Sequence, residues 1–235
     1  MWRKLPITSI TPFTFLDYPG HTACILWFSG CNMACGYCHN PELVKGELRR
    51  LPGERIARFL DSRRDKLEGV VLSGGECTLS PALPDLARHL KGMGFKVKVD
   101  TNGTQPDRLA AMLAEELVDF VALDMKAPRA RFADVTGIDA WHKVMRSLCL
   151  ITSAAIGREV RTTVHTGLIG REDIEAVMGE LAEAGYHGRY VIQNFRQGRT
   201  LGGLGAPARP LDLKGLAAAN LEIVFRNFPE KTEAD

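Results

Sequence analysis

The sequence lacks any apolar run that approaches the roughly 18 residues of a membrane span. It also lacks a strong charge of either sign, because 30 Lys and Arg residues face 28 Asp and Glu residues, a formal net charge of +2. This balance gives no electrostatic argument for binding to nucleic acid or to a membrane. No secretion signal is expected, since Pro6, Thr8 and Ser9 interrupt any apolar core near the start. We therefore expect a cytoplasmic protein with neither nucleic acid nor membrane as a partner.

The sequence contains no internal repeat and no low-complexity segment. Of its 235 residues, 45% are hydrophobic and 25% are charged. This composition is ordinary for a globular protein and excludes a disordered, collagenous or coiled-coil chain. A chain of this length can build one large core or two small ones.

The six cysteines are too few for a secreted disulfide scaffold, which would be shorter and richer in cysteine. Three of them, Cys31, Cys35 and Cys38, crowd into eight positions, and this spacing predicts metal binding or redox chemistry. Cys24, in an apolar segment, and Cys149, on a predicted helix face, are expected to be core residues.

Short apolar segments alternate with amphipathic helical patterns along the chain. Six segments are typical of buried parallel strands: residues 23–28, 69–72, 95–99, 120–123, 160–164 and 190–192. Helical spacing predicts helices around 56–60, 109–117 and 174–182, and a final helix over 213–225. This alternation implies a parallel sheet with right-handed crossovers. Because six units fall short of a closed eight-unit barrel, we predict an α/β fold, an open partial (β/α)6 parallel barrel whose carboxyl-end loops carry the chemistry.

We divide the chain into an N-terminal segment (1–20), the partial barrel (21–197) and a C-terminal part of the same domain (198–235) that carries a glycine-rich loop and the final helix. Residues 17–20 and the glycine-rich loop (198–207) are expected to flank the barrel mouth and to reorganise around an incoming peptide. No large inserted domain is expected to enclose a small substrate. These features favour a protein backbone as the substrate.

The strongest motif is CNMACGYC (31–38), directly after the first predicted strand. Its three thiolates can hold three irons of a cubane and leave the fourth iron without a protein ligand. An open metal position of that kind is where chemistry on a bound ligand can occur. Soft thiolates also suit zinc, with His39 as a fourth ligand. The adjacency of Cys38 and His39 makes such a tetrahedron awkward.

Polar motifs lie at the ends of the second to sixth predicted strands or within them. Paired glycines allow backbone to come close to a ligand, and a carboxylate can accept hydrogen bonds from an ammonium group. The motifs are GGE (74–76), DTNG (100–103), DMK (124–126), Arg161, and Gln193 with Asn194. Their place at one end of successive strands is what a single cofactor site across a barrel mouth requires.

The CxxxCxxC spacing, with an aromatic residue before the last cysteine, resembles the radical S-adenosylmethionine (SAM) superfamily. The closer resemblance is to glycyl-radical-enzyme activating proteins, above all the group that activates anaerobic ribonucleoside-triphosphate reductase. It covers nearly the whole chain and implies the radical SAM type of partial barrel. It rests on DYPG (17–20), FSGC (28–31), YCHNP (37–41), the GGE, DTNG and DMK segments, and Arg161.

This resemblance implies a [4Fe–4S] cluster and SAM as cofactors. The three clustered cysteines would hold the cluster, and the GGE segment would bind the amino group of SAM. Tyr37 would lie against the adenine, while Lys126 and Arg161 would pair with the carboxylate. The catalytic metal ligands expected are Cys31, Cys35 and Cys38, and the cofactor contacts expected are Tyr37, Gly74, Gly75, Glu76, Asp100, Thr101, Asn102, Asp124, Lys126, Arg161 and Gln193.

Two further points follow from the same resemblance. Asp100, Thr101 and Asp124 match positions that hold a monovalent cation in a related activase, so a cation is expected here. The chain departs from the family where Cys77 replaces the usual proline after GGE, and where HTG replaces VPG at His165 and the two residues that follow it. Neither departure removes a ligand. Cys77 and His165 are expected to be buried structural residues.

The implied activity is reductive cleavage of SAM by the cluster, which yields methionine and a 5′-deoxyadenosyl radical. The radical would take a hydrogen atom from a backbone glycine of a glycyl-radical enzyme, the expected partner. The 35 residues between Cys38 and Gly74 contain no cysteine, so no inserted ferredoxin-like domain is expected. Electrons would then come from an external flavodoxin or ferredoxin.

Three alternatives stay open. The first is a small-molecule radical SAM enzyme, such as a deazapurine-ring synthase, for which Gln193, Asn194 and Arg196 are the spare polar residues. The second is a non-catalytic iron–sulfur or zinc module, which would have no affinity for SAM and would leave the strand-end motifs without a role. The third is SAM chemistry that leaves no radical on a protein. Resemblance at the level of the fold does not decide between substrates.

Overall fold

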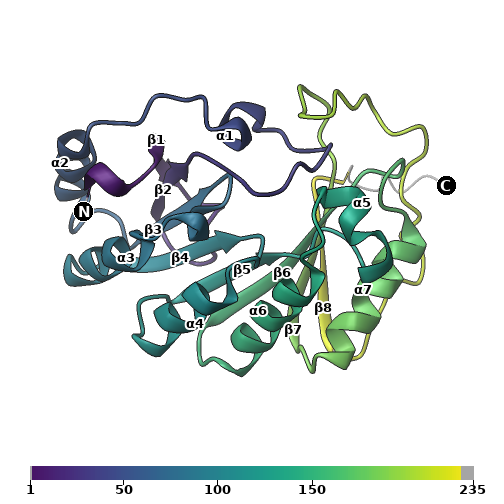
Figure 1. Ribbon diagram of the computed structural model, residues 1–235. Coiled ribbons are helices and arrows are strands. Elements are labelled where there is room, and N and C mark those ends of the chain that lie inside the picture. Colours follow the sequence, from purple (N-terminus) through teal and green to yellow (C-terminus); the bar gives the residue numbers. More distant parts are fainter. Residues whose placement is uncertain (1, 229–235) are drawn as a thin grey trace.

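The computed structural model describes residues 2–228, which are built around an eight-stranded sheet with the strands in chain order (Figure 1). β1 (Ile7–Thr14) is antiparallel to β2 (Ala23–Phe28), and every later pair of neighbours is parallel. The other strands are β3 (Gly69–Gly74), β4 (Lys96–Thr101), β5 (Phe120–Asp124), β6 (Gly157–Val164), β7 (Gly188–Asn194) and β8 (Leu221–Arg226).

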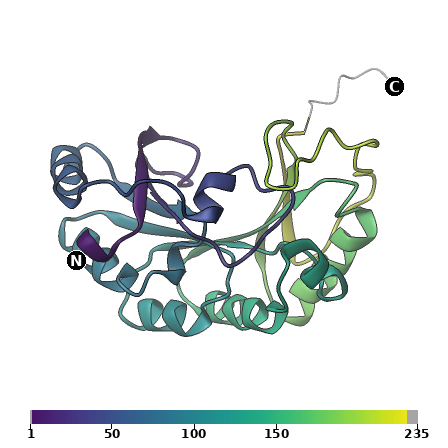
Figure 2. The ribbon, with the colours of Figure 1, turned by 45° about the horizontal axis from the view of Figure 1, so that its top comes forward.

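Helices lie in every connection between the parallel strands from β2 to β7, and α3, α4, α6 and α7 lie along one face of the sheet (Figure 2). Residues 195–220, between β7 and β8, form no helix. Each turns an apolar stripe inward; in α7, for example, Ile174, Val177 and Leu181 are fully buried. None of the helices within residues 2–228 is long and apolar enough to cross a membrane. The helices are α1 (Pro41–Lys45), α2 (Gly53–Arg63), α3 (Leu83–Gly92), α4 (Pro106–Ala114), α5 (Phe132–Thr136), α6 (Trp141–Ser153) and α7 (Arg171–Glu183).

The sheet is curved but not closed, because β1 and β8 are its two ends and do not pair with each other within residues 2–228. The six predicted parallel strands are all present, as β2 to β7. The prediction of an open, parallel α/β barrel is therefore confirmed. The sheet has one further strand at each edge, which the apolar pattern did not predict.

The final helix predicted over 213–225 is wrong. Residues 213–220 form loops and turns, and the next six residues form β8, which pairs with β7 so that Leu221 lies opposite Gly188. β-branched Ile223 and Val224 favour a strand, and the pairing satisfies backbone groups along the edge of β7. Residues 229–235 of the predicted C-terminal part lie outside the described residues.

Residues 17–20 lie at the end of the barrel opposite to the predicted mouth, so the expectation that they flank the site is wrong. Because β1 is antiparallel to β2, the turn after β1 meets the amino ends of the parallel strands. There Tyr18 is buried and packs in one cluster with Ala23, Ile25 and Val71. The tyrosine side chain therefore fills the amino end of the barrel.

The two cysteines that were expected in the core differ in their burial. Cys24 on β2 is fully buried, as predicted, whereas Cys149 on α6 is exposed, so that prediction is wrong. The buried stripe of α6 consists of Val144, Ser147, Leu148 and Ile151. Cys149 lies one position beyond Leu148, about 100° round the helix, and so points away from the sheet.

Candidate active site

The cysteine loop (residues 31–38) follows the carboxyl end of β2. A residue far along the sequence helps to hold the loop in place, because the amide of Ala34 donates to the carbonyl of Thr136 at the end of α5 (2.8 Å). The three thiols are free; Cys35 is buried and the other two are partly exposed. Burial raises the pKa of Cys31 to about 11 and also raises the pKa of Cys35. Metal binding must therefore displace protons here, since the thiolate is the ligand.

The GGE segment lies against the backbone that leads into the cysteine loop. The amide of Gly75 donates to the Phe28 carbonyl (2.9 Å), and that of Glu76 donates to the Gly30 carbonyl (2.8 Å). A Cβ atom on Gly74 would lie 2.2 Å from the Phe28 oxygen, and one on Gly75 would lie 2.3 Å from the Gly30 oxygen. The two glycines therefore serve close backbone packing, a role that the sequence did not reveal.

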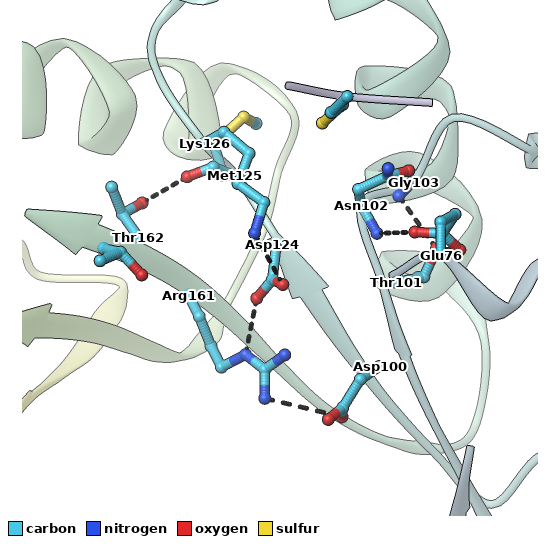
Figure 3. Close-up of polar contacts among 12 residues, drawn as sticks. Glu76, Asp100, Thr101, Asn102, Gly103, Asp124, Met125, Lys126, Arg161 and Thr162 are labelled. Carbon is cyan, nitrogen blue, oxygen red and sulfur yellow. Dashed lines mark hydrogen bonds and ion pairs between the residues drawn. The ribbon is translucent and has the colours of Figure 1, made fainter. Parts of the chain in front are cut away.

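Glu76 extends from the end of β3 and is only 3% exposed. Its Oε1 accepts hydrogen bonds from the amide of Thr78 (3.0 Å), the Thr78 hydroxyl and the Thr101 hydroxyl (2.8 Å). Its Oε2 accepts from the amide of Asn102 (2.6 Å; Figure 3). Burial raises the pKa of Glu76, although these donors act in the opposite direction. Oε2, with the fewer internal donors, is the oxygen with a lone pair left for a ligand.

Ion pairs join the ends of β4, β5 and β6 (Figure 3). Asp124 accepts from Lys126 Nζ (2.9 Å) and from Arg161 Nε (2.7 Å), and Arg161 Nη1 lies 3.6 Å from Asp100 Oδ1. Burial opposes ionisation of Asp124, but Arg161 and Lys126 outweigh it and hold the pKa of Asp124 below its usual range. Burial also opposes the charge on Lys126, but Asp124 outweighs it and raises the pKa of Lys126. Both partners are therefore charged at neutral pH.

A single cavity brings the cysteine loop and these strand ends together. The Tyr37 hydroxyl is buried at its wall and has no hydrogen-bond partner within residues 2–228, and burial raises the pKa of this group. The expected site residues that line the cavity are Cys31, Cys35, Cys38, Tyr37, Gly74, Gly75, Glu76, Asp100, Thr101, Asn102, Asp124, Lys126 and Arg161. The cavity also has lining residues that were not among the expected cofactor contacts: Trp27, Met33, His39, Asn40, Val44, Ser73 and Thr163.

Gln193 is the expected site residue that does not line this cavity. Its Nε2 donates to Thr163 Oγ1 (3.5 Å) on β6, and its Oε1 accepts from Arg226 Nη1 (3.3 Å) on β8. Thr163 thus stands between Gln193 and the cavity. Arg226 was outside the sequence prediction because β8 was expected to be helical.

Asn102 ties the end of β4 to the cysteine loop. Its Nδ2 donates to Asn32 Oδ1 (3.0 Å), and Asn32 in turn donates to the hydroxyl of Thr104 (3.0 Å). Asn102 Oδ1 accepts from that same hydroxyl (2.7 Å). This closed set of hydrogen bonds positions the residue that follows Cys31. Neither Asn32 nor Thr104 was predicted, because nothing in their spacing shows that the two segments meet.

The glycine-rich loop (198–207) packs on the cysteine loop, which confirms that it flanks the site. The amide of Leu201 donates to the Cys38 carbonyl (2.9 Å), and the amide of Gly202 donates to the Gly36 carbonyl (2.8 Å). A Cβ on Gly202 would lie 2.8 Å from Gly36 Cα, so the two loops touch backbone to backbone. The cysteine loop is therefore held on both sides.

His165, which begins the HTG departure, is 7% exposed, as expected for a buried structural residue. Its Nδ1 accepts from the amide of Gly167 (3.2 Å), so Nε2 carries the proton and donates to the carbonyl of Gly205 (3.1 Å). The ring also meets Phe195 edge-on, with ring centres 4.8 Å apart. His165 thus anchors the glycine-rich loop to the end of β6.

We predict that Gly202→Ala loosens the cysteine loop. The new methyl group would press on the Gly36 backbone, and overpacking of this kind costs about 1–3 kcal/mol. Denaturant unfolding followed by circular dichroism should show this loss, and loading with iron and sulfide should give fewer irons per chain. Gly205→Ala is the matched control, since a Cβ there meets nothing within 4 Å. Equal results for the two variants would contradict the prediction.

The zinc alternative required His39 to close a tetrahedron with the three cysteines. Its ring instead stacks on Phe195, with ring centres 5.1 Å apart and planes 25° apart. Across residues 2–228, no three His, Cys, Asp or Glu side chains converge on a point where they could share one metal ion. Thiolates that bind three separate irons of a cubane have no need to meet at a single ion.

The sequence profile of the radical SAM superfamily matches residues 25–181, from β2 to α7. The chain belongs to the radical SAM superfamily. The matched stretch contains the cysteine loop, the GGE segment and the ion pairs of Asp124. The resemblance stated from the motifs is thus confirmed.

Relatives in this superfamily carry several activities. A protein of Methanocaldococcus jannaschii, described as a candidate glycyl-radical enzyme activating enzyme, is 30% identical over 82% of this chain and 80% of its own length. The pyruvate formate-lyase-activating enzyme of Clostridium pasteurianum is 32% identical over 51% of this chain. The 7-carboxy-7-deazaguanine synthase of Methanopyrus kandleri is 33% identical over 47% of this chain. The chain spans 52% of the length of each of the last two.

Solved radical SAM structures share this fold. SuiB of Streptococcus suis is similar with a TM-score of 0.64 and 16% identity, over 84% of this chain and 47% of its own. The enzyme anSMEcpe, solved with bound SAM, is similar with a TM-score of 0.55 and 19% identity, over 73% of this chain and 52% of its own. At these identities the likeness concerns the fold alone, and it confirms the radical SAM type of partial barrel.

Membership implies a [4Fe–4S] cluster and SAM, and the chemistry of the cavity fits both groups. Three free thiols on one loop border it. Glu76 Oε2 can accept from an ammonium group, and Lys126 and Arg161 are donors for a carboxylate. The partnerless hydroxyl of Tyr37 is a buried polar atom for which a ligand can supply the missing hydrogen bond.

Proposed function

We propose that this radical SAM protein is an activating enzyme that generates a glycyl radical on a partner, with anaerobic ribonucleoside-triphosphate reductase as the expected partner. The observation that carries the proposal is the 30% identity over 82% of the chain to the candidate activating enzyme of Methanocaldococcus jannaschii. The pyruvate formate-lyase-activating enzyme among the relatives supports the same class of activity.

The clustered cysteines and the charged residues at the strand ends have separate tasks in this proposal. The three cysteines would hold the cluster, whose reduced form supplies the electron that cleaves SAM to methionine and a 5′-deoxyadenosyl radical. Glu76 Oε2 would accept from the SAM ammonium group, and Lys126 and Arg161 would bind its carboxylate. Tyr37 would lie against the adenine. The packed loops on either side of Cys35 would exclude water from the site.

The proposed substrate is a backbone glycine on a loop of the partner enzyme. The barrel is open at its edges, and the glycine-rich loop borders the cavity through its contacts with the cysteine loop. An incoming peptide could reach the cavity beside that loop. We also propose that an external flavodoxin or ferredoxin reduces the cluster.

Anaerobic incubation of the iron-loaded protein with dithionite and SAM tests the first half of the proposal, by the formation of 5′-deoxyadenosine. The second half is tested by adding a glycyl-radical enzyme encoded in the same genome and recording electron paramagnetic resonance spectra. A glycyl doublet on the partner is the expected result. Turnover of SAM with every such partner left silent would reject the activase. A protein that neither binds nor cleaves SAM would be the non-catalytic module.

One alternative has its own supporting observation. The 33% identity to a 7-carboxy-7-deazaguanine synthase, over 47% of the chain, favours a small-molecule radical SAM enzyme of the deazapurine class. A small-molecule enzyme requires polar groups beyond those that serve SAM. The spare polar groups are Gln193, which donates to the cavity residue Thr163, and Arg226, which donates to Gln193; neither lines the cavity itself. Conversion of a small-molecule substrate by the SAM-cleaving protein, without a protein radical, would favour this alternative over the activase.

A further inference from the structure

A fully buried lysine extends the ion pairs of the candidate site. Lys98 and Asp100 lie two positions apart on β4, so their side chains point to the same face of the sheet. The Lys98 side chain is 1% exposed; its Nζ contacts Asp100 Oδ1 and lies 5.6 Å from the centre of the Phe120 ring. A buried ammonium group is costly unless it is paired. Asp100 therefore has a permanent partner within the chain.

Thr101, one of the three residues expected to bind a monovalent cation, uses its hydroxyl in hydrogen bonds to other residues. Its hydroxyl donates to Glu76 Oε1 (2.8 Å) and accepts from the amide of Gly103 (3.0 Å). Figure 3 shows the Thr101 side chain beside Glu76 and apart from Asp124. The expected ligands therefore do not converge on one point.

The two carboxylates of the expected cation site are also matched by side-chain cations. Asp100 Oδ1 contacts Lys98 and lies 3.6 Å from Arg161, and the two oxygens of Asp124 bind Arg161 and Lys126. A cation bound by Asp100 Oδ1 or by either oxygen of Asp124 would have to compete with one of these groups. The residues present do not fit the monovalent cation that the resemblance implied.

The charges of this set leave a surplus that suits an anionic ligand group. Lys98, Lys126 and Arg161 contribute three positive charges, against two negative charges from Asp100 and Asp124. The next acid, Glu159, lies 3.9 Å from Arg161 but is faced by two further arginines on β7 and β8. The negative charge of Glu159 is therefore balanced by these arginines. One net positive charge of Lys98, Lys126 and Arg161 is left for a carboxylate.

We propose that Lys98 takes the place of the monovalent cation, neutralising Asp100 from within the barrel so that Arg161 stays available to the carboxylate of SAM. This inference rests on the SAM site of the proposed function. Without Lys98, Asp100 would need another cation, and Arg161 at 3.6 Å is the nearest. Arg161 would then turn from the cavity toward Asp100. Lys98 is a positioning residue in this scheme, because it acts through Asp100 and Arg161.

The test compares cations of one ionic strength: sodium, potassium and choline, which is too large for the site. SAM affinity of the iron-loaded wild-type chain is expected to be the same in all three, by calorimetry. In choline, Lys98→Met should lose about ten- to a hundredfold in SAM affinity, the worth of a charge-assisted contact. Sodium or potassium should restore most of it by occupying the vacated position. Lys96→Met, on the same strand but exposed, is the matched control and should behave as wild type.

Thermal unfolding of the iron-free chain gives a second readout that does not require SAM. The midpoint of Lys98→Met should rise when sodium or potassium replaces choline, and the midpoint of wild type should not. The double variant Lys98→Met with Asp100→Asn, which lacks both charges, should lose the response. If Lys98→Met folds only in sodium or potassium, that is the same rescue in a stronger form.

Three results would overturn the inference: a wild-type chain that needs sodium or potassium to bind SAM, a Lys98→Met chain that binds SAM in choline as wild type does, or a Lys98→Met chain whose instability is equal in all three salts. Failure of the proposed function looks different. An iron-loaded wild-type chain without SAM affinity in any salt would remove the SAM site, and the unfolding midpoints would then decide the role of Lys98 on their own.

Discussion

Replacing Cys31, Cys35 or Cys38 with Ala is expected to abolish the brown chromophore of the iron-loaded protein, or to leave a degraded cluster, and to abolish SAM cleavage. Each of the three thiolates would hold a separate iron of the cluster, so the loss of one thiolate would leave two irons without a protein ligand. Iron and sulfide analysis, with absorption spectra recorded under anaerobic conditions, measures the effect. We expect the loss of activity to be complete for each of the three variants.

The chain supplies its own control cysteines. Cys149→Ala changes an exposed thiol on α6, and Cys24→Ala changes a buried thiol on β2 within the apolar core. Both should retain the full iron content, although Cys24→Ala is expected to lower the stability because it leaves a small cavity. Stoichiometric zinc without iron in protein purified anaerobically would refute the cluster and the mechanism built on it.

Glu76→Ala is expected to keep the cluster and to lose SAM cleavage. The variant removes the carboxylate that we propose as the acceptor for the SAM ammonium group, and a charge-assisted contact is worth about 1.5–3 kcal/mol, roughly ten- to a hundredfold in affinity. It also strands the amides of Thr78 and Asn102 and the hydroxyl of Thr101. Each stranded buried donor costs about 1–3 kcal/mol of stability. Binding of SAM by calorimetry and unfolding by denaturant separate the two effects.

Two further variants test the role of Glu76 more directly. Thr101→Val removes one hydrogen-bond donor to Glu76 but keeps the carboxylate, so it should lower stability and retain SAM binding. Lys126→Ala removes the partner expected for the other end of the SAM methionine and should lose SAM cleavage with the cluster retained. Unchanged SAM affinity in both Glu76→Ala and Lys126→Ala would mean that these are ordinary charged residues at strand ends.

The sequence predicted the parts of the fold that depend on local pattern. Buried parallel strands are continuous apolar runs, and β2 to β7 all have that form. β1 and β8 are edge strands, one of which carries a proline at residue 12, and their existence depends on pairing with distant neighbours. The prediction for residues 17–20 was wrong for the same reason, because their position depends on the antiparallel pairing of β1 with β2.

The candidate site was predictable where a residue acts through its own chemistry and its place at a strand end. The cysteines, Glu76 and Lys126 belong to that group, and they line one cavity. Residues that act through another residue left no such signal. The partner of Lys98 and the bond from Asn102 to Asn32 depend on which side chains meet across strands, which a single sequence does not show.

The contact between the glycine-rich loop and the cysteine loop has a consequence for biosynthesis. Leu201 comes 163 residues after Cys38, yet its amide is one of those that fix the cysteine loop. A ribosome therefore releases Cys38 long before Leu201, and chains fold as units only once their distant contacts can form. The nascent chain thus carries its three clustered thiols without these contacts until Leu201 and Gly202 have left the ribosome. We therefore expect iron and sulfide to enter the finished geometry of the cysteine loop only after translation has passed the glycine-rich loop.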